Sequence, residues 1–190
     1  MKLPKKQKLI GAAVIIGTVG FSLLLVSIPS DTLIGYLGTK NAYAFVFLIA
    51  FLGSITTFAS IPYPLILLSV VHGGLDPIAA GSLSALGVIT SDICTFFAAQ
   101  RGRALLSEKF TKSLDALSRF AKKHPRILLL CIMFYGIFSP VSNDFAVISL
   151  SLMRLSFWRV IPLLAIGNLI YNIGIAYLGV YAYDWITNLL

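Results

Sequence analysis

A carboxylate and three polar side chains stand inside a long apolar stretch of this chain, around a proline. The stretch covers residues 127–153, and its middle reads Ser139-Pro140-Val141-Ser142-Asn143-Asp144. A charged side chain at a bilayer centre costs roughly 2.5–3.5 kcal/mol on insertion scales, so such residues usually face a cavity or a partner and often mark a transport path. Proline interrupts a helix, and opened backbone at membrane depth must be covered by protein or water. We therefore predict two half-helices that meet at a break; the alternative is one proline-kinked helix with Asp144 near an interface.

The composition indicates one integral membrane domain. Of the 190 residues 58% are hydrophobic and 12% are charged, with a mean hydropathy of +0.92, which is too apolar for a soluble protein. The net charge is +8, but the basic residues lie between apolar segments, where they meet anionic lipid headgroups, so we do not expect nucleic-acid binding. Cys94 and Cys131 both fall in apolar segments and predict neither a disulfide framework nor a metal site.

The other apolar segments can be ordered along the chain. Residues 9–28 are uncharged and long enough to span a bilayer, and the lysines before them place the N-terminus in the cytoplasm, as an uncleaved anchor. Residues 42–75 are too long for one straight helix and are broken by Ser60-Ile61-Pro62-Tyr63-Pro64. Residues 77–100 form a clear span, which Asp76 opens as a cap and Pro77 as the first helical residue.

The charge of the next segment decides the topology. Residues 101–126 carry eight basic and two acidic residues, so the positive-inside rule places them in the cytoplasm. A full crossing by residues 42–75 would put them outside, and we therefore predict that residues 42–75 form a re-entrant hairpin. By the same reasoning residues 127–153 form a second re-entrant hairpin, residues 160–181 form the last spanning helix, and the C-terminus lies outside.

Within the basic segment, apolar residues recur at helical spacing and predict an amphipathic helix. Its place is either the cytoplasmic headgroup layer or the surface of other loops. The residues that we expect to contact lipid headgroups are Arg101, Arg103, Lys109, Lys112, Lys122 and Lys123.

The two halves of the chain also match each other weakly at one constant offset. This offset places residues 58–64 over 138–144, Gly87 over Gly167 and Asp92 over Asn172. Since the two hairpins enter from opposite faces, the halves would form an inverted repeat, and such repeats hold their binding site where the breaks meet near the bilayer centre. The expected breaks are Pro62, Pro64 and Pro140, and the expected pathway residues are Asp144, Asp92, Asn143, Ser139, Asn172, Ser60 and Tyr63.

These segments resemble the DedA family of VTT-domain membrane proteins over roughly residues 45–181. The resemblance rests on the following motifs: Ile61-Pro62-Tyr63-Pro64, Gly87 and Asp92 ahead of Arg101-Gly102-Arg103, Ser139-Pro140 ahead of Phe157-Trp158, and Gly167-Asn168-Leu169-Ile170-Tyr171-Asn172 with Gly179. The family is linked to carrying polyprenyl-phosphate and phospholipid headgroups across bilayers. This chain has Pro64 where the family has a carboxylate, and Ile137 and Asn143 where it has arginines, so the resemblance implies a divergent member.

Together these patterns predict an all-helical membrane protein with three spanning helices, two opposed re-entrant hairpins and one amphipathic surface helix. We expect it to transport a lipid headgroup or another amphiphile, with Asp92 and Asp144 as titratable groups that bind a coupling proton or cation. The alternative function is a membrane scaffold or assembly protein of the same fold. No nucleophile, metal cluster or phosphate loop indicates an enzyme or a cofactor, and the sequence leaves a homo-oligomer open.

Overall fold

The computed structural model describes residues 35–36, 38–55, 63–103, 108–138 and 143–187. Throughout these ranges the regular secondary structure is helical, which confirms the predicted fold class at the level of all-α. The helices are α3 (Thr39–Ile55), α4 (Tyr63–His72), α5 (Pro77–Gly102), α6 (Glu108–Lys123), α7 (Pro125–Phe138), α8 (Asp144–Leu152) and α9 (Phe157–Thr187). The predicted span at residues 9–28 lies outside the described residues, as do the predicted breaks Pro62 and Pro140 and the predicted pathway residues Ser60 and Ser139.

Two of the described helices are long and apolar enough to cross a membrane, namely Pro77–Gly102 and Phe157–Tyr181. By length and composition they indicate membrane association, and they coincide with the spans predicted at residues 77–100 and 160–181. The first of them, α5, begins where the sequence predicts, because the Asp76 carboxylate accepts a 2.7 Å hydrogen bond from the Ala79 N–H and Pro77 takes the first helical position.

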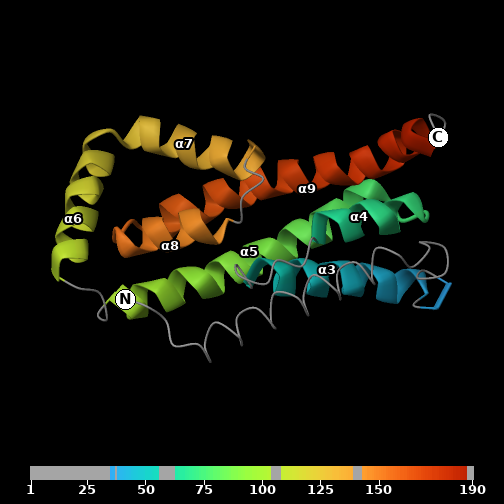
Figure 1. Cartoon of the computed structure of the whole chain (residues 1–190), viewed down its shortest axis with the longest axis horizontal. Helices are drawn as coiled ribbons and strands as arrows, with labels where there is room; N and C mark the ends of the chain where they lie inside the picture. Colours follow the sequence, from blue (N-terminus) through green and yellow to red (C-terminus); the bar gives the residue numbers. More distant parts are fainter. Residues whose placement is uncertain (1–34, 37, 56–62, 104–107, 139–142, 188–190) are drawn as a thin grey trace, which may run out of the picture.

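The shorter helices form two antiparallel pairs at opposite ends of the molecule (Figure 1). Helix α7 runs away from α6, and α8 runs back toward it, so residues 127–153 form two helices and not one kinked helix. Helices α3 and α4 form the other pair and also run in opposite directions. There the Asp76 N–H donates a 3.1 Å hydrogen bond to the Tyr43 hydroxyl, which ties the first turns of α3 to the residues after α4.

Glycines set the distance between the helices. A Cβ at Gly87 of α5 would clash with the Phe47 carbonyl of α3, and one at Gly167 of α9 would lie 2.8 Å from the Gly136 Cα of α7. The α5–α9 contact is equally close, since a Cβ at Gly81 would lie 2.8 Å from the Ile173 Cα. These helices therefore pack backbone against backbone, as small residues permit between membrane helices.

Each pair also packs on both long helices. Helix α3 lies on α5 and α7 on α9, whereas the second helix of each pair crosses over, so that α4 packs on α9 and α8 packs on α5. At the α4 crossing a Cβ on Gly179 would lie 2.8 Å from the Leu68 carbonyl. At the α8 crossing the Ser151 hydroxyl donates a 2.6 Å hydrogen bond to the Phe96 carbonyl.

The turn from α4 into α5 is a Schellman motif. The Leu75 N–H bonds to the Val70 carbonyl at 3.4 Å, and the Gly74 N–H bonds to the Val71 carbonyl at 3.0 Å. Gly74 has a φ of 104°, a left-handed conformation that glycine adopts without steric cost.

The turn from α8 into α9 repeats this motif in the second half of the chain. The Leu155 N–H bonds to the Leu150 carbonyl at 3.2 Å, and the Arg154 N–H bonds to the Ser151 carbonyl at 2.9 Å. Arg154 takes the left-handed position, with a φ of 56°. The offset that sets Gly87 over Gly167 also sets Gly74 over Arg154, so it joins equivalent positions of the two turns.

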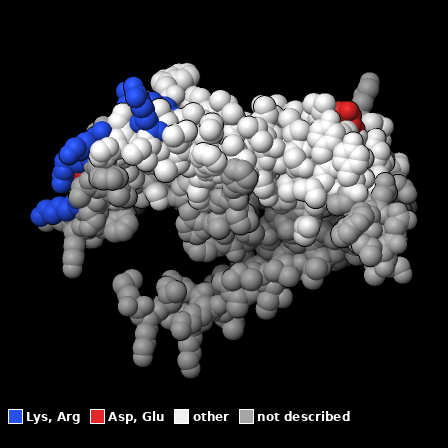
Figure 2. Space-filling view, turned by 90° about the horizontal axis from the view of Figure 1, so that it is seen from above, with Lys and Arg blue, Asp and Glu red and all other residues white. Residues whose placement is uncertain are grey.

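Helix α6 lies across the end of the molecule where α5 finishes and α9 begins (Figure 1). Leu114 and Ala121 on its apolar side are buried in the hydrophobic cluster that includes Phe96, Leu150 and Leu164. The predicted amphipathic segment is thus helical, and its described apolar residues pack on the body of the protein. In Figure 2 the Lys and Arg side chains gather at this end of the face shown, while its middle is white.

Candidate functional site

A network of buried polar side chains occupies the contact between α5 and α9. At its centre the Asn168 amide of α9 donates a 3.0 Å hydrogen bond to Asp92 Oδ2 of α5. Asn168 is 2% exposed and Asp92 is 1% exposed. The Asn143 amide, directly before α8, donates a hydrogen bond to Asn168 Oδ1. Asn168 therefore joins three elements of the fold at one buried point.

The network continues along α9 to the start of α4. The Asn172 amide donates a 2.8 Å hydrogen bond to the Asn168 carbonyl, and Asn172 Oδ1 accepts a 2.8 Å hydrogen bond from the Ser84 hydroxyl of α5. Tyr63, the first residue of α4, lies beside the Asn172 side chain. Residues at the starts of α4 and α8 thus reach neighbouring asparagines on one face of α9.

A second carboxylate lies beside this network. Asp144 is the first residue of α8 and is 1% exposed. Its Oδ1 accepts a 3.4 Å hydrogen bond from the Thr95 hydroxyl, and Asp144 interacts electrostatically with Asp92. The first turn of a helix favours a negative charge, because its backbone N–H groups are unpaired and point toward it.

Two oxygen atoms of the network lack a hydrogen-bond partner. Within the described ranges these are Asp92 Oδ1 and the hydroxyl of its neighbour Ser91, which is 0% exposed. A buried polar atom without a partner costs about 1–3 kcal/mol, and a charged one costs more. A proton on the carboxylate, or a cation beside it, would remove that cost.

No family model, curated protein or solved structure matches this chain. Membership of the DedA family, which the sequence motifs predict, therefore stays a prediction.

The network contains all five of the predicted pathway residues that the structure describes. Asp92, Asn143, Asp144, Asn172 and Tyr63 all belong to it, although they come from separate parts of the sequence. Ser60 and Ser139 lie outside the described residues. Neither of the two cavities at the α6 end is lined by a residue of the network.

The structure adds residues that the sequence reasoning did not assign to the pathway. Asn168 lies at the centre of the network, and the Ser84 and Thr95 hydroxyl groups donate hydrogen bonds to Asn172 and Asp144. Asn168 and Asn172 are four residues apart and therefore lie on one helix face, and this spacing was the sequence feature that indicated a shared role. Ser84 and Thr95 carry no such signal, because hydroxyl groups are common in apolar helices and only tertiary contact shows which ones pair.

Two further predicted residues occupy different surroundings from those expected. Pro64 is the second residue of α4 and not part of the break, a position where proline is tolerated because the helix needs no N–H there. Arg103 is 9% exposed and forms a 2.6 Å ion pair with Asp115 of α6, so it fastens α6 to the end of α5. Of the other predicted headgroup contacts, Arg101, Lys112 and Lys123 are exposed, and the Lys109 and Lys122 side chains are outside the described set.

Proposed function

We propose that this protein is a membrane transporter for an amphiphile with a polar headgroup. The single observation that supports it is the buried polar network between α5 and α9, the two longest described helices. This network contains two carboxylates, Asp92 and Asp144, each 1% exposed, and residues at the starts of α4 and α8. Ionisable residues within membrane helices are expensive and therefore usually functional. A scaffold of the same shape would need no carboxylate at this point.

The proposed architecture is an inverted repeat of α3–α5 and α7–α9, in which each antiparallel pair is a re-entrant hairpin. Three observations support it: the two Schellman turns at equivalent positions of the halves, the close glycine contacts at Gly87 and Gly167, and the reciprocal packing of α4 on α9 and α8 on α5. In transporters built from inverted repeats, the substrate site lies where interrupted helices meet near the bilayer midplane. In this proposal the polar network is the corresponding site.

In this proposal Asp92 and Asp144 bind the coupling proton or cation. A proton on Asp92 Oδ1 would turn an unpaired acceptor into a donor, while Asn143, Asn172 and Tyr63 line the path of the headgroup. Ser60 and Ser139, which lie outside the described residues, are the other two pathway residues predicted from the sequence. Because a bound positive charge lowers the cost of burying the carboxylates, its arrival and release would change the stability of the closed network.

The proposed orientation places the α6 end in the cytoplasm. Its support is the concentration of basic side chains there (Figure 2), which include the exposed residues Arg101, Lys112, Arg119, Lys123 and Arg126. The N-terminus would then be cytoplasmic and the C-terminus outside, in a cell membrane. The resemblance noted in the sequence implies phospholipid or polyprenyl-phosphate headgroups as the substrate class.

The test is a lipid-flipping assay on the purified protein in proteoliposomes. Asp92→Asn and Asp144→Asn should each reduce transport to the background rate while thermal unfolding stays cooperative. Asp76→Asn is the matched control, because Asp76 is an exposed carboxylate that caps α5 and asparagine caps equally well. A wild-type protein that moves no lipid, or variants that move it at the wild-type rate, would favour the scaffold instead.

A further inference from the structure

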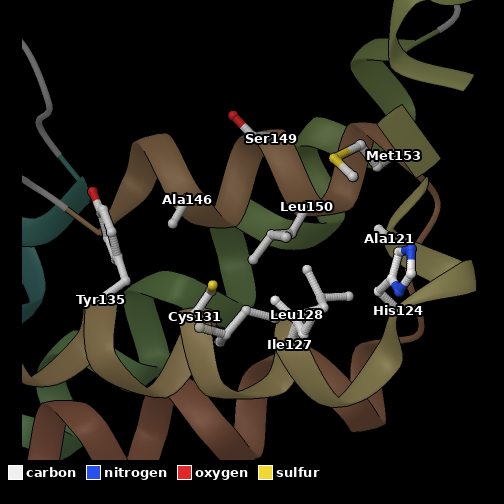
Figure 3. Close-up of a pocket in the computed structure, with 11 residues that line it drawn as sticks. Ala121, His124, Ile127, Leu128, Cys131, Tyr135, Ala146, Ser149, Leu150 and Met153 are labelled. Atoms are coloured by element: carbon white, nitrogen blue, oxygen red, sulfur yellow. The ribbon is translucent and has the colours of Figure 1, made fainter. Parts of the chain in front are cut away.

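Two adjoining cavities lie along α7, and no residue of the polar network lines either of them. The first has a volume of about 480 Å³ and lies between α7 and α8 (Figure 3). Leu128, Cys131 and Leu150 point into it in this view, with His124 and Met153 at the end nearest α6. Its wall is lined by Ala121, His124, Ile127, Leu128, Cys131, Ile132, Tyr135, Ala146, Ser149, Leu150 and Met153, and is mostly apolar.

The second cavity, of about 490 Å³, adjoins the first along α7 and has a different chemistry. It shares Ala121, Leu128 and Ile132 with the first cavity, so the two are neighbours across one ridge of α7. Its lining also includes two arginines, Arg154 in the turn after α8 and Arg159 in the first turn of α9.

These two arginines have no carboxylate partner among the described residues. The ion pair found in those residues joins Arg103 to Asp115. Both are exposed, and both line the same cavity. The cavity therefore has a positive wall whose charge an external ligand can neutralise.

We propose that a bilayer lipid with an anionic headgroup binds here, with a hydrocarbon chain between α7 and α8 and its headgroup on Arg154 and Arg159. A neutral apolar molecule would leave the arginines unused, and a small soluble anion would leave the apolar cavity empty. An anionic amphiphile matches both, and both volumes lie in the range of ~300–1,000 Å³ that is typical of ligand sites. The site is separate from the polar network, so it does not depend on the transport proposal.

The two cysteines provide an internal comparison for the test. Cys131 lines the first cavity, whereas Cys94 of α5 lines neither, and both are exposed. The purified full-length protein, in an uncharged detergent, would be alkylated with a maleimide in the presence of phosphatidylglycerol or phosphatidylcholine. Mass spectrometry then gives the rate at each cysteine. We expect phosphatidylglycerol to slow the modification of Cys131 severalfold relative to Cys94, and phosphatidylcholine to have no such effect.

Charge variants test the headgroup position. Arg154→Gln with Arg159→Gln should raise the phosphatidylglycerol concentration needed for half-protection of Cys131 by about 30-fold, the loss expected for two basic residues near anionic lipid. Arg119→Gln with Arg126→Gln removes the same charge from exposed positions of α6 and α7 that line neither cavity, and should change it little. Equal shifts in both double variants would mean diffuse attraction to a basic surface and would overturn the site.

A cavity-filling variant tests the chain position. Ala146 points into the first cavity in Figure 3, so Ala146→Phe should abolish the phosphatidylglycerol that stays bound in native mass spectrometry. Retention of the lipid by a folded Ala146→Phe protein would place the chain elsewhere and refute the proposal. No step of this test measures lipid flipping, so its failure and a failure of transport are distinguishable.

Discussion

Two glycines of α9 offer a test of the backbone contact between α7 and α9. A Cβ added at Gly167 would lie 2.8 Å from the Gly136 Cα and 2.9 Å from the Gly136 carbonyl carbon. A Cβ added at Gly174, two turns further along the same helix, would meet nothing within 4 Å. Gly167→Ala and Gly174→Ala are therefore the same chemical change in two different surroundings.

The comparison isolates the energy of the contact. Alanine is favoured over glycine inside a helix by roughly 0.5–1 kcal/mol, and both variants receive this gain. Only Gly167→Ala also forces α7 away, because the clashing atoms are backbone and cannot rotate aside. Overpacking of this kind costs about 1–3 kcal/mol. We expect the free energy of unfolding of Gly167→Ala to be lower than that of Gly174→Ala by this amount, with Gly174→Ala above wild type.

Unfolding of the purified variants in mixed detergent, followed by the loss of helical circular dichroism, measures the difference. Gly136→Ala adds a graded case, since its nearest contact would be 3.2 Å and its effect should fall between the other two. A difference below about 0.5 kcal/mol, the usual scatter of surface substitutions, would show that α7 does not touch α9 at this point. The same outcome would remove one support of the inverted repeat.

Two further predictions concern the topology and the network. Single cysteines in place of Lys112 and Arg154 should react with an impermeant reagent from the cytoplasmic side only, and one in place of Asp76 from the outer side only; any other distribution contradicts the opposed hairpins. Asn168→Ala should lower the free energy of unfolding by about 1–3 kcal/mol, because it leaves both Asp92 oxygens without a partner among the described residues; an unchanged unfolding midpoint would mean that the hydrogen bond to Asn168 stabilises nothing.

The features that were predictable from sequence are those with a local cause. Asp76 and Pro77 predict the start of α5, because an N-cap residue and a proline at the first helical position affect only the first turn of the helix. The interruption of residues 127–153 follows equally from a proline in an apolar run, and the structure has separate helices on either side of residues 139–142. The match between the two halves was visible only at scattered positions, yet the same offset relates the two Schellman turns.

The features that were missed depend on contacts between distant parts of the chain. In the sequence Arg103 is one of several basic residues in the same segment. Its ion pair with Asp115 is evident only from the position of α6 in the structure. The central role of Asn168 depends on Asn143 arriving from the start of α8, 25 residues earlier in the sequence. Periodicity and charge counts carry no information on such pairings, because they describe one segment at a time.

The crossed packing of α4 on α9 and α8 on α5 has a consequence for the order in which the protein is made. Helix α4 leaves the ribosome roughly 100 residues before the end of α9, which is on the order of 5–20 s at ~5–20 residues per second. Throughout that interval Leu68 lacks the Gly179 surface on which it packs in the finished protein. The N-terminal half therefore cannot complete its folding on its own during synthesis, and a chain that stops before α9 should be recognised as unfolded and degraded, although all of its own helices have been made.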